Sequence, residues 1–223
     1  MKKIVDSRFG IDIDIHEGFV CSLVIEHSKM FYEFVSDIYR QSVGETGSVI
    51  LSENYTPLDI KKHADVITQL VPFTVNRKDL INKIYARLSD ISVSDELYYL
   101  TLEMYSYLEK YLYEITDDFS SLLTFKRPSD IGWLLKGFGL GFDEQELTLS
   151  ERILEYLIAV NEYIKKNTFI IVGLRSYLSD RQAYELYKSI LLRGITLICI
   201  DSHECTLLEC EQRTIIDSDM CII

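Results

Sequence analysis

The segment from Lys165 to Asp201 constrains the fold of this chain more than any other. It reads KKNTFIIVGLRSYLSDRQAYELYKSILLRGITLICID. An apolar run, Phe169 to Val172, precedes a turn and an amphipathic helical pattern, and a second apolar run follows Gly194. Short uninterrupted apolar runs of this kind are typical of strands buried on both faces of a parallel sheet. The segment therefore predicts a strand–helix–strand unit and an α/β fold.

Both ends of the chain contribute to this predicted sheet, which is mixed but mostly parallel. Residues 10–16, GIDIDIH, alternate in polarity, and residues 19–25, FVCSLVI, form an apolar run, so we expect a half-exposed and a buried strand. Thr56-Pro57 predicts a short helix with proline at its first position. Residues 220–223 predict an edge strand. Capping boxes at helix starts are predicted at Thr148–Glu151 and Ser179–Gln182.

The middle third of the chain is predicted to be entirely helical. Asn76, Ser94 and Ser129 are candidate N-caps of three successive helices. The second of these carries many tyrosines, which predicts helix–helix packing, because tyrosine buries its ring and keeps its hydroxyl in water. The chain is thus expected to have an α/β head built from residues 1–75 and 142–223, with an inserted helical leg formed by residues 76–141.

Charge is distributed unevenly along this acidic chain. The net charge is −12, which by itself argues against a nucleic-acid partner. Residues 61–90 and 165–193 are rich in lysine and arginine, whereas residues 95–118 and 201–219 are rich in aspartate and glutamate. Screening limits electrostatic reach to about 10 Å, so local potential decides whether phosphate is attracted. Either a basic surface on an acidic body or ordinary solvated faces would give this pattern.

The motifs of nucleotide hydrolysis and of serine catalysis are absent. The residues after the first buried strand read EHSKMF and contain no glycine, so no Walker loop is present to hold phosphate. The nucleophile elbow G-x-S-x-G is also absent. Asp201 ends a hydrophobic strand as a Walker B carboxylate would, or it caps the next turn. The sequence thus predicts an NTPase-like sheet without the Walker motif, in which Walker-type NTP hydrolysis is disfavoured.

Cysteine and carboxylate positions give no clear metal motif. The five cysteines are odd in number and include no C-x-x-C pair, which favours reduced thiols over zinc. The remaining alternative is a site formed by cysteines near His203. The chain has no run of about 18 apolar residues and no apolar signal core after its first lysines, so we expect a cytoplasmic protein.

In the order of its predicted strands and helices and in their residue patterns, the chain resembles the CRISPR-associated adaptation protein family of type II-A systems. The resemblance rests on the N-terminal strand pair FGIDIDIHEGFVCSLVIEHSKMFYEFVSDIY, the helical leg, the segment YIKKNTFIIVGLRSYLSDRQAYELYKSI and the final strand GITLICIDSHE. It covers nearly the whole chain and is most specific over residues 163–200.

This resemblance implies a non-catalytic protein of prokaryotic antiviral defence. Such proteins form homotetrameric rings whose positive hole binds double-stranded DNA ends without sequence preference. They act during spacer acquisition with the CRISPR integrase proteins and the type II effector nuclease. The family also implies calcium bound by carboxylates of the leg, for which Glu114, Asp117 and Asp118 are the candidates here, because LLTFKR at residues 122–127 lacks acids.

A ring of this kind needs only phosphate contacts from lysine and arginine. The candidates, chosen by charge clustering, are Lys61, Lys62, Lys126, Arg127, Lys136, Lys165, Lys166 and Arg175. Two alternatives remain open. One is a protein–protein adaptor whose acidic, tyrosine-rich leg docks a basic partner, and the other is a diverged NTPase that uses Asp201.

Overall fold

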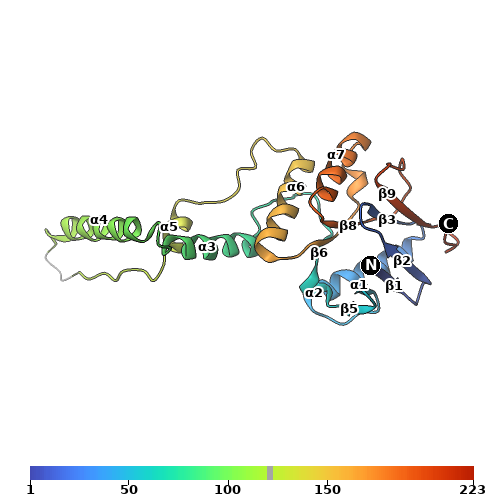
Figure 1. Cartoon of the computed structure of the whole chain (residues 1–223), viewed down its shortest axis with the longest axis horizontal. Helices are drawn as coiled ribbons and strands as arrows, with labels where there is room; N and C mark the ends of the chain where they lie inside the picture. The colour runs from blue at the N-terminus through green and yellow to red at the C-terminus, as the bar shows by residue number, and fades with distance from the viewer. Residues whose placement is uncertain (120–122) are drawn as a thin grey trace. The chain divides into compact units, whose positions relative to one another are not determined.

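The structure, a computed structural model, describes residues 1–119 and 123–223 (Figure 1). The chain divides into two compact units, and each is described by itself. The sheet unit contains residues 1–75 and 144–223, and the helical unit contains residues 76–143. Within the described ranges, no helix combines the length and the apolar character needed to cross a membrane.

A five-stranded parallel sheet forms the centre of the sheet unit. Its strands lie in the order β6-β7-β8-β3-β9. They are β3 (Val20–Ile25), β6 (Ala64–Ile67), β7 (Thr168–Val172), β8 (Thr196–Asp201) and β9 (Glu211–Ile216). β7 and β8 pair in parallel, with Phe169 opposite Leu197, and helix α7 (Asp180–Leu191) connects them. The predicted strand–helix–strand unit and the α/β class are both confirmed.

A second, antiparallel sheet holds the other strands of this unit. Its order is β2-β1-β4-β5. The strands are β1 (Lys2–Asp6), β2 (Ile11–Ile15), β4 (Ile50–Glu53) and β5 (Thr56–Leu58). The predicted alternation in β2 is confirmed, because Ile11, Ile13 and Ile15 are buried while Asp12 is exposed. Instead of one mixed sheet, the antiparallel strands form a sheet of their own.

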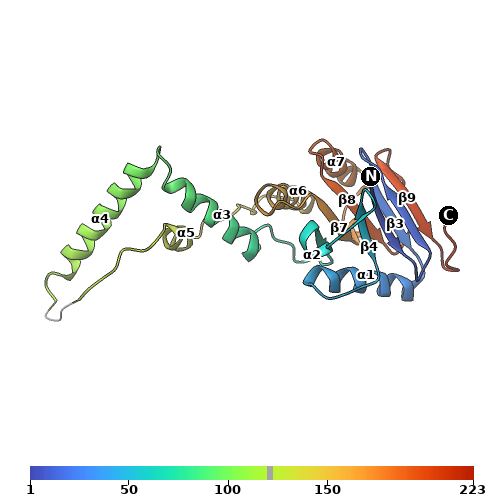
Figure 2. The ribbon, with the colours of Figure 1, turned by 60° about the horizontal axis from the view of Figure 1, so that its bottom comes forward.

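Two layers cover the faces of the parallel sheet, with α1 and α7 on opposite sides (Figure 2). On one face, helix α1 (Ser28–Val43) and the antiparallel sheet share an apolar cluster with β7 and β8, whose members include Phe34, Ile170 and Ile198. On the other face lie α7 and α6 (Leu149–Ala159). There the Tyr187 hydroxyl is 3.3 Å from Cys199 Sγ. The capping boxes predicted for both of these helices are present.

Buried charge joins the antiparallel sheet to α1. Asp37 of α1 is 1% exposed, and its Oδ2 accepts hydrogen bonds from the backbone N–H groups of Ser48 and Val49, both 2.8 Å away. The same oxygen accepts from Arg8 Nη2 at 3.0 Å, and that nitrogen also donates to Asp6 Oδ2 at 2.6 Å. One guanidinium therefore links the end of β1 to the helix and to the segment that leads into β4.

The helix predicted at Thr56-Pro57 is wrong, and the edge strand predicted at residues 220–223 is present only in part. Thr56-Pro57 lies in strand β5, and the short helix α2 (Ile60–His63) begins later, after Asp59. Pro57 sits opposite Ser52 on an edge strand, where a missing N–H is tolerated. The tail forms no full strand, but it pairs with the edge strand β9 through the bridge of Ile216 with Ile222 and through two backbone hydrogen bonds between Ile215 and Ile223, 3.1 and 2.9 Å long.

The helical unit contains α3 (Lys78–Ser92), α4 (Tyr98–Thr116) and α5 (Gly132–Gly137). Asn76 is not the N-cap of α3, because its side chain forms two hydrogen bonds with the backbone of Phe142, 2.9 and 2.8 Å long. The other two predicted caps also shift, to Leu97 and Ile131. In the described residues Tyr105 is the one buried tyrosine of α4, and Tyr113 packs its ring against Phe125, with centroids 4.8 Å apart. The exposed tyrosines of the helix are Tyr98, Tyr99, Tyr107, Tyr111 and Tyr113.

We expect Asp37→Ala to lower the free energy of unfolding by about 3–5 kcal/mol, because it leaves two backbone N–H groups and a guanidinium without their shared acceptor. Arg40→Gln removes a half-exposed partner of the same carboxylate, 3.4 Å away, and should cost less than about 1 kcal/mol. Urea denaturation followed by circular dichroism measures both. Equal losses for the two variants would contradict the central role of Asp37.

Candidate nucleic-acid interface

The carboxyl edge of the parallel sheet is where α/β proteins commonly bind ligands. Here β3 passes into α1 through Glu26 and His27 without a glycine. His27 caps the helix, since its Nδ1 accepts the backbone N–H of Met30 at 3.2 Å. Ser28 is the first helical residue. The turn thus lacks the row of free amides that a phosphate loop provides.

Asp201 lies at the same edge, at the end of β8 beside Val24 of β3. It is 2% exposed, and neither carboxylate oxygen has a hydrogen-bond partner among the described residues. Burial raises the pKa of Asp201 to about 6, against the opposing influence of the Arg175 backbone N–H and of His203. The carboxylate therefore does not cap the following turn.

Arg175 is a structural residue at this edge. Its side chain is 2% exposed, with Nη1 2.9 Å from Glu211 Oε1 and Nη2 2.6 Å from Asp180 Oδ1. Nη2 also donates to the backbone carbonyl of Thr206 at 3.2 Å. Arg213 holds the other Glu211 oxygen, at 2.9 Å. A guanidinium that is buried and neutralised in this way cannot reach a DNA phosphate, so the prediction for Arg175 is corrected.

The opposite, amino edge of the parallel sheet carries cations in front of three neighbouring strands. Lys61 and Lys62 come just before β6, Lys165 and Lys166 before β7, and Arg193 before β8. All of these except Lys166 are exposed. Lys166 Nζ donates to the carbonyl of Ala64 at 2.7 Å, which ties β7 to β6. Since the strands are parallel and adjacent, their amino ends lie at one edge.

The remaining candidates belong to the helical unit. Lys126 and Lys136 are exposed and have no ion pair in the described parts of the chain. Arg127 is exposed too, but two of its three guanidinium nitrogens are used: Nε and Nη2 donate to Glu109 at 2.7 and 2.9 Å. Its guanidinium also lies over the ring of Tyr105, 5.3 Å from the centroid. Arg127 is thus partly neutralised within the unit.

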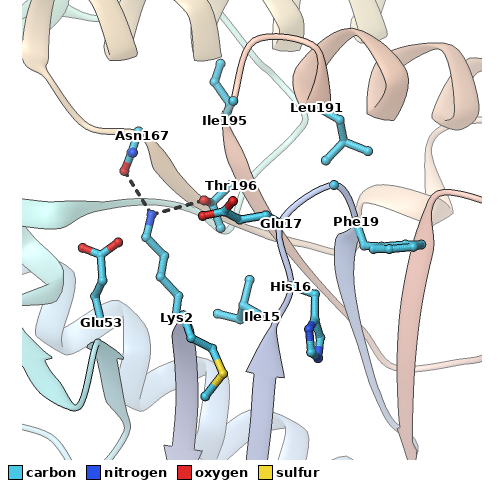
Figure 3. Close-up of a pocket in the computed structure, with 13 residues that line it drawn as sticks. Lys2, Ile15, His16, Glu17, Phe19, Glu53, Asn167, Leu191, Ile195 and Thr196 are labelled. Atoms are coloured by element: carbon cyan, nitrogen blue, oxygen red, sulfur yellow. Dashed lines mark hydrogen bonds between the residues drawn. The ribbon is translucent and has the colours of Figure 1, made fainter.

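A hollow of about 440 Å³ opens at the amino edge, next to the antiparallel sheet (Figure 3). Lys2 reaches across it, and its Nζ donates to Asn167 Oδ1 at 3.2 Å, Thr168 Oγ1 at 2.8 Å and Thr196 Oγ1 at 3.2 Å. Burial lowers the pKa of Lys2, while the carboxylates of Glu53 and Glu17 raise it. All three protons of this ammonium are used, so Lys2 fastens β1 to β7 and β8.

Residues 41–220 match the family model described as CRISPR-associated protein (Cas_Csn2). The chain belongs to the Cas_Csn2 family. No curated protein sequence matches it significantly. The resemblance noted from the sequence is thereby confirmed, and with it a role in CRISPR adaptation.

Solved structures agree with the fold expected of a Cas_Csn2 protein. Stu0660 of Streptococcus thermophilus has a TM-score of 0.58 and 11% sequence identity, with 96% of this chain and 74% of that chain covered. An ATP-binding cassette of an ABC transporter, MJ1267, has a TM-score of 0.48 and 11% identity, with 96% and 86% covered.

The carboxylates considered for calcium do not converge in this Cas_Csn2 chain. Across residues 1–119 and 123–223, no three side chains of histidine, cysteine, aspartate or glutamate are grouped so as to hold a metal ion. Glu114, Asp117 and Asp118 are exposed, and Glu114 lies 3.8 Å from Lys110. All five cysteines are free thiols. The cysteine site near His203 is likewise not formed.

Sequence reasoning missed two residues of the amino edge, Lys2 and Arg193. Lys2 was read only as part of a charged N-terminus, and strand β1 was not predicted. Arg193 belongs to the basic segment 165–193 but was left out of the candidates. Its position directly before the apolar run of β8, like that of Lys165 before β7, is the sequence signal that would have identified it.

Asp201→Asn should make the Cas_Csn2 chain more stable at neutral pH. An acid with a raised folded-state pKa contributes its full stability below the unfolded value of 3.8 and loses it as pH rises through about 6. Asparagine cannot ionise, so we expect a gain on the order of 2–3 kcal/mol above pH 7 that fades toward pH 4. Urea denaturation across this pH range measures the gain.

The control for this experiment is Glu209→Gln, which changes the net charge equally at an exposed acid of the same loop. It should leave stability unchanged across the pH range. A loss of stability for Asp201→Asn at pH 8 would contradict the assignment, because it would mean that the carboxylate has a donor or a cation in solution.

Proposed function

We propose that this chain is a non-catalytic protein that binds double-stranded DNA ends during CRISPR spacer acquisition. It binds without sequence preference, as a homotetrameric ring. The family supplies the role in adaptation. The observation that carries the rest is the amino edge, where cations precede three adjacent parallel strands of an otherwise acidic chain. Contacts of lysine and arginine with phosphate suffice for binding that ignores base sequence.

Free ammonium groups support this proposal. The side-chain ammonium groups of Lys126, Lys136 and Lys165 make neither a hydrogen bond nor an ion pair within the described parts of the chain. Each can therefore neutralise a phosphate without first breaking an internal contact. Lys61 and Lys62 are held only weakly, through a 3.3 Å contact with the Val43 carbonyl and a 3.5 Å contact with Asp59. Exposed pairs of this kind contribute little to stability, so DNA can compete for them.

Exposed apolar surface on α4 supports self-association. Tyr99 is 79% exposed, and Leu100, Tyr107 and Tyr111 are at least 60% exposed. Monomeric proteins rarely leave contiguous apolar surface of this kind in water. A second copy of the chain would cover it, as a ring of identical subunits requires.

The same helix favours one alternative function, a protein–protein adaptor in the adaptation complex. Residues 95–118 contain seven acids and one lysine, and exposed tyrosines lie among them. A basic partner, such as a DNA integrase, would complement this surface. Reversing the charge of Glu103 and Glu114 separates the two ideas: loss of spacer acquisition with DNA binding intact supports the adaptor.

Native mass spectrometry with linear and closed circular duplexes of one sequence tests the proposed function. We expect a species of four 25.9 kDa chains that retains linear DNA and does not load onto the circle. A monomer, or equal binding of both DNA forms, would contradict the ring.

A salt titration tests the phosphate contacts. Log K plotted against log salt concentration falls with a slope of about −0.9 per neutralised phosphate. The triple variant Lys126→Gln, Lys136→Gln, Lys165→Gln should therefore give a shallower slope than the wild type. Lys110→Gln, at a lysine that lies 3.8 Å from Glu114, is the control and should not change the slope. An unchanged slope in the triple variant would exclude these lysines as contacts.

A further inference from the structure

A second hollow, of about 570 Å³, adjoins the one in Figure 3 at the amino edge, and both are lined by Ile195. It is bordered by the end of α6 and by the turn between α7 and β8. Its lining residues are Ile158, Asn161, Glu162, Lys165, Arg193 and Ile195. We call it the cationic hollow.

The backbone brings Lys165 to this hollow by an unusual route. Helix α6 widens into a π-helical turn, Val160–Ile164, and Lys165 then ends it in a left-handed conformation with φ 68°. Its N–H donates to the Val160 carbonyl at 3.0 Å. π-helical turns occur frequently at functional sites, and a non-glycine residue in this conformation is strained. Glycine would end the helix at this position with less backbone strain. A lysine here therefore indicates a role for its side chain.

Arg193 faces the same hollow from the other side. Its Nη1 donates to the carbonyl of Ser189 at 2.8 Å, at the end of α7. Its Nε and Nη2 have no partner in the described ranges, and neither Lys165 nor Arg193 forms an ion pair there. Glu162 is the one acid of the lining, so two cations and one anion leave a positive excess. The bond of Nη1 to Ser189 fixes the orientation of the Arg193 guanidinium. Nε and Nη2 are then available to donate two parallel hydrogen bonds to one oxyanion.

We propose that Lys165 and Arg193 together hold one phosphate group of duplex DNA in the cationic hollow. The inference rests on the proposed function and deepens it, because it assigns Arg193 as a contact and pairs it with Lys165. The half-buried Asn161 amide lies in the same lining as a further donor. Lys61 and Lys62 then meet neighbouring phosphates along the same edge, before β6.

The test measures binding of a fluorescent linear duplex by anisotropy between 50 and 200 mM KCl. Arg193→Gln and Lys165→Gly each remove one cation, and the glycine suits the left-handed backbone. Each should make the slope of log K against log salt shallower by about 0.9 for every copy of the hollow that contacts the DNA. The double variant should lose the same amount and not twice as much, because both side chains serve one phosphate. Glu162→Gln should tighten binding.

Arg181→Gln is the matched control, since it removes one positive charge from an exposed arginine that pairs with Glu185 at 3.0 Å on α7. Circular dichroism of every variant checks that the fold is kept. If the wild type binds duplex and both hollow variants behave like Arg181→Gln, the inference is overturned while the proposed function stands. If the double variant loses the sum of the two single slope changes, Lys165 and Arg193 do not contact the same phosphate. A wild type that ignores duplex at 50 mM KCl would overturn both.

Discussion

Strand β1 is fixed at both of its ends by charged hydrogen bonds, and the arrangement of the sheet unit depends on them. At one end Asp6 binds Arg8, which also binds Asp37 of α1. At the other end the Lys2 ammonium donates to Asn167, Thr168 and Thr196, at the amino ends of β7 and β8. The first tie places the antiparallel sheet over α1, and the second joins it to the edge that carries the cations. Because these groups are partly or fully buried, removing one partner costs more than the pair contributes.

The parts of the fold that the sequence predicts correctly are those with strong local periodicity. The runs of β3, β7 and β8 and the capping boxes of α6 and α7 depend on residues near one another in the chain. β1 and β9 were missed, because KKIVD holds only two apolar residues and EQRTII is mostly polar. Their strand character comes from distant partners, β2 and β4 for β1 and β3 for β9. The wrong helix at Pro57 has the same cause. Proline is common at helix starts, but here pairing with Ser52 of β4 holds Pro57 in a strand.

Charge clustering locates the basic segments of the candidate site but cannot separate structural from free cations. Arg175 and Lys165 belong to the same cluster in the sequence, yet the first is neutralised by Glu211, which follows it by 36 positions, and the second is exposed. Lys166 is likewise taken up by the Ala64 carbonyl. These partners depend on the order of the strands in the sheet, because Glu211 belongs to β9 and Ala64 to β6. Among the candidates of the sheet unit, the cations that remain exposed are Lys61, Lys62 and Lys165, and all three lie at the amino edge.

The distribution of charge also explains why the two edges of this sheet differ in what they can bind. After the carboxyl end of β7, the Arg175 guanidinium is neutralised by Asp180 and Glu211, and at the end of β8 the buried Asp201 carboxylate has no hydrogen-bond partner among the described residues. An anionic nucleotide would meet this carboxylate at the carboxyl edge, and no glycine loop follows β3 to hold its phosphates. At the amino edge Lys61, Lys62, Lys165 and Arg193 are exposed, and neither Lys165 nor Arg193 forms an ion pair within the described residues. No enclosed crevice is needed there to contact a rigid polyanion whose charge repeats every ~1.7 Å along its axis. A parallel sheet that has lost its phosphate loop at one edge can therefore still contact phosphate at the other, through side chains in place of backbone amides.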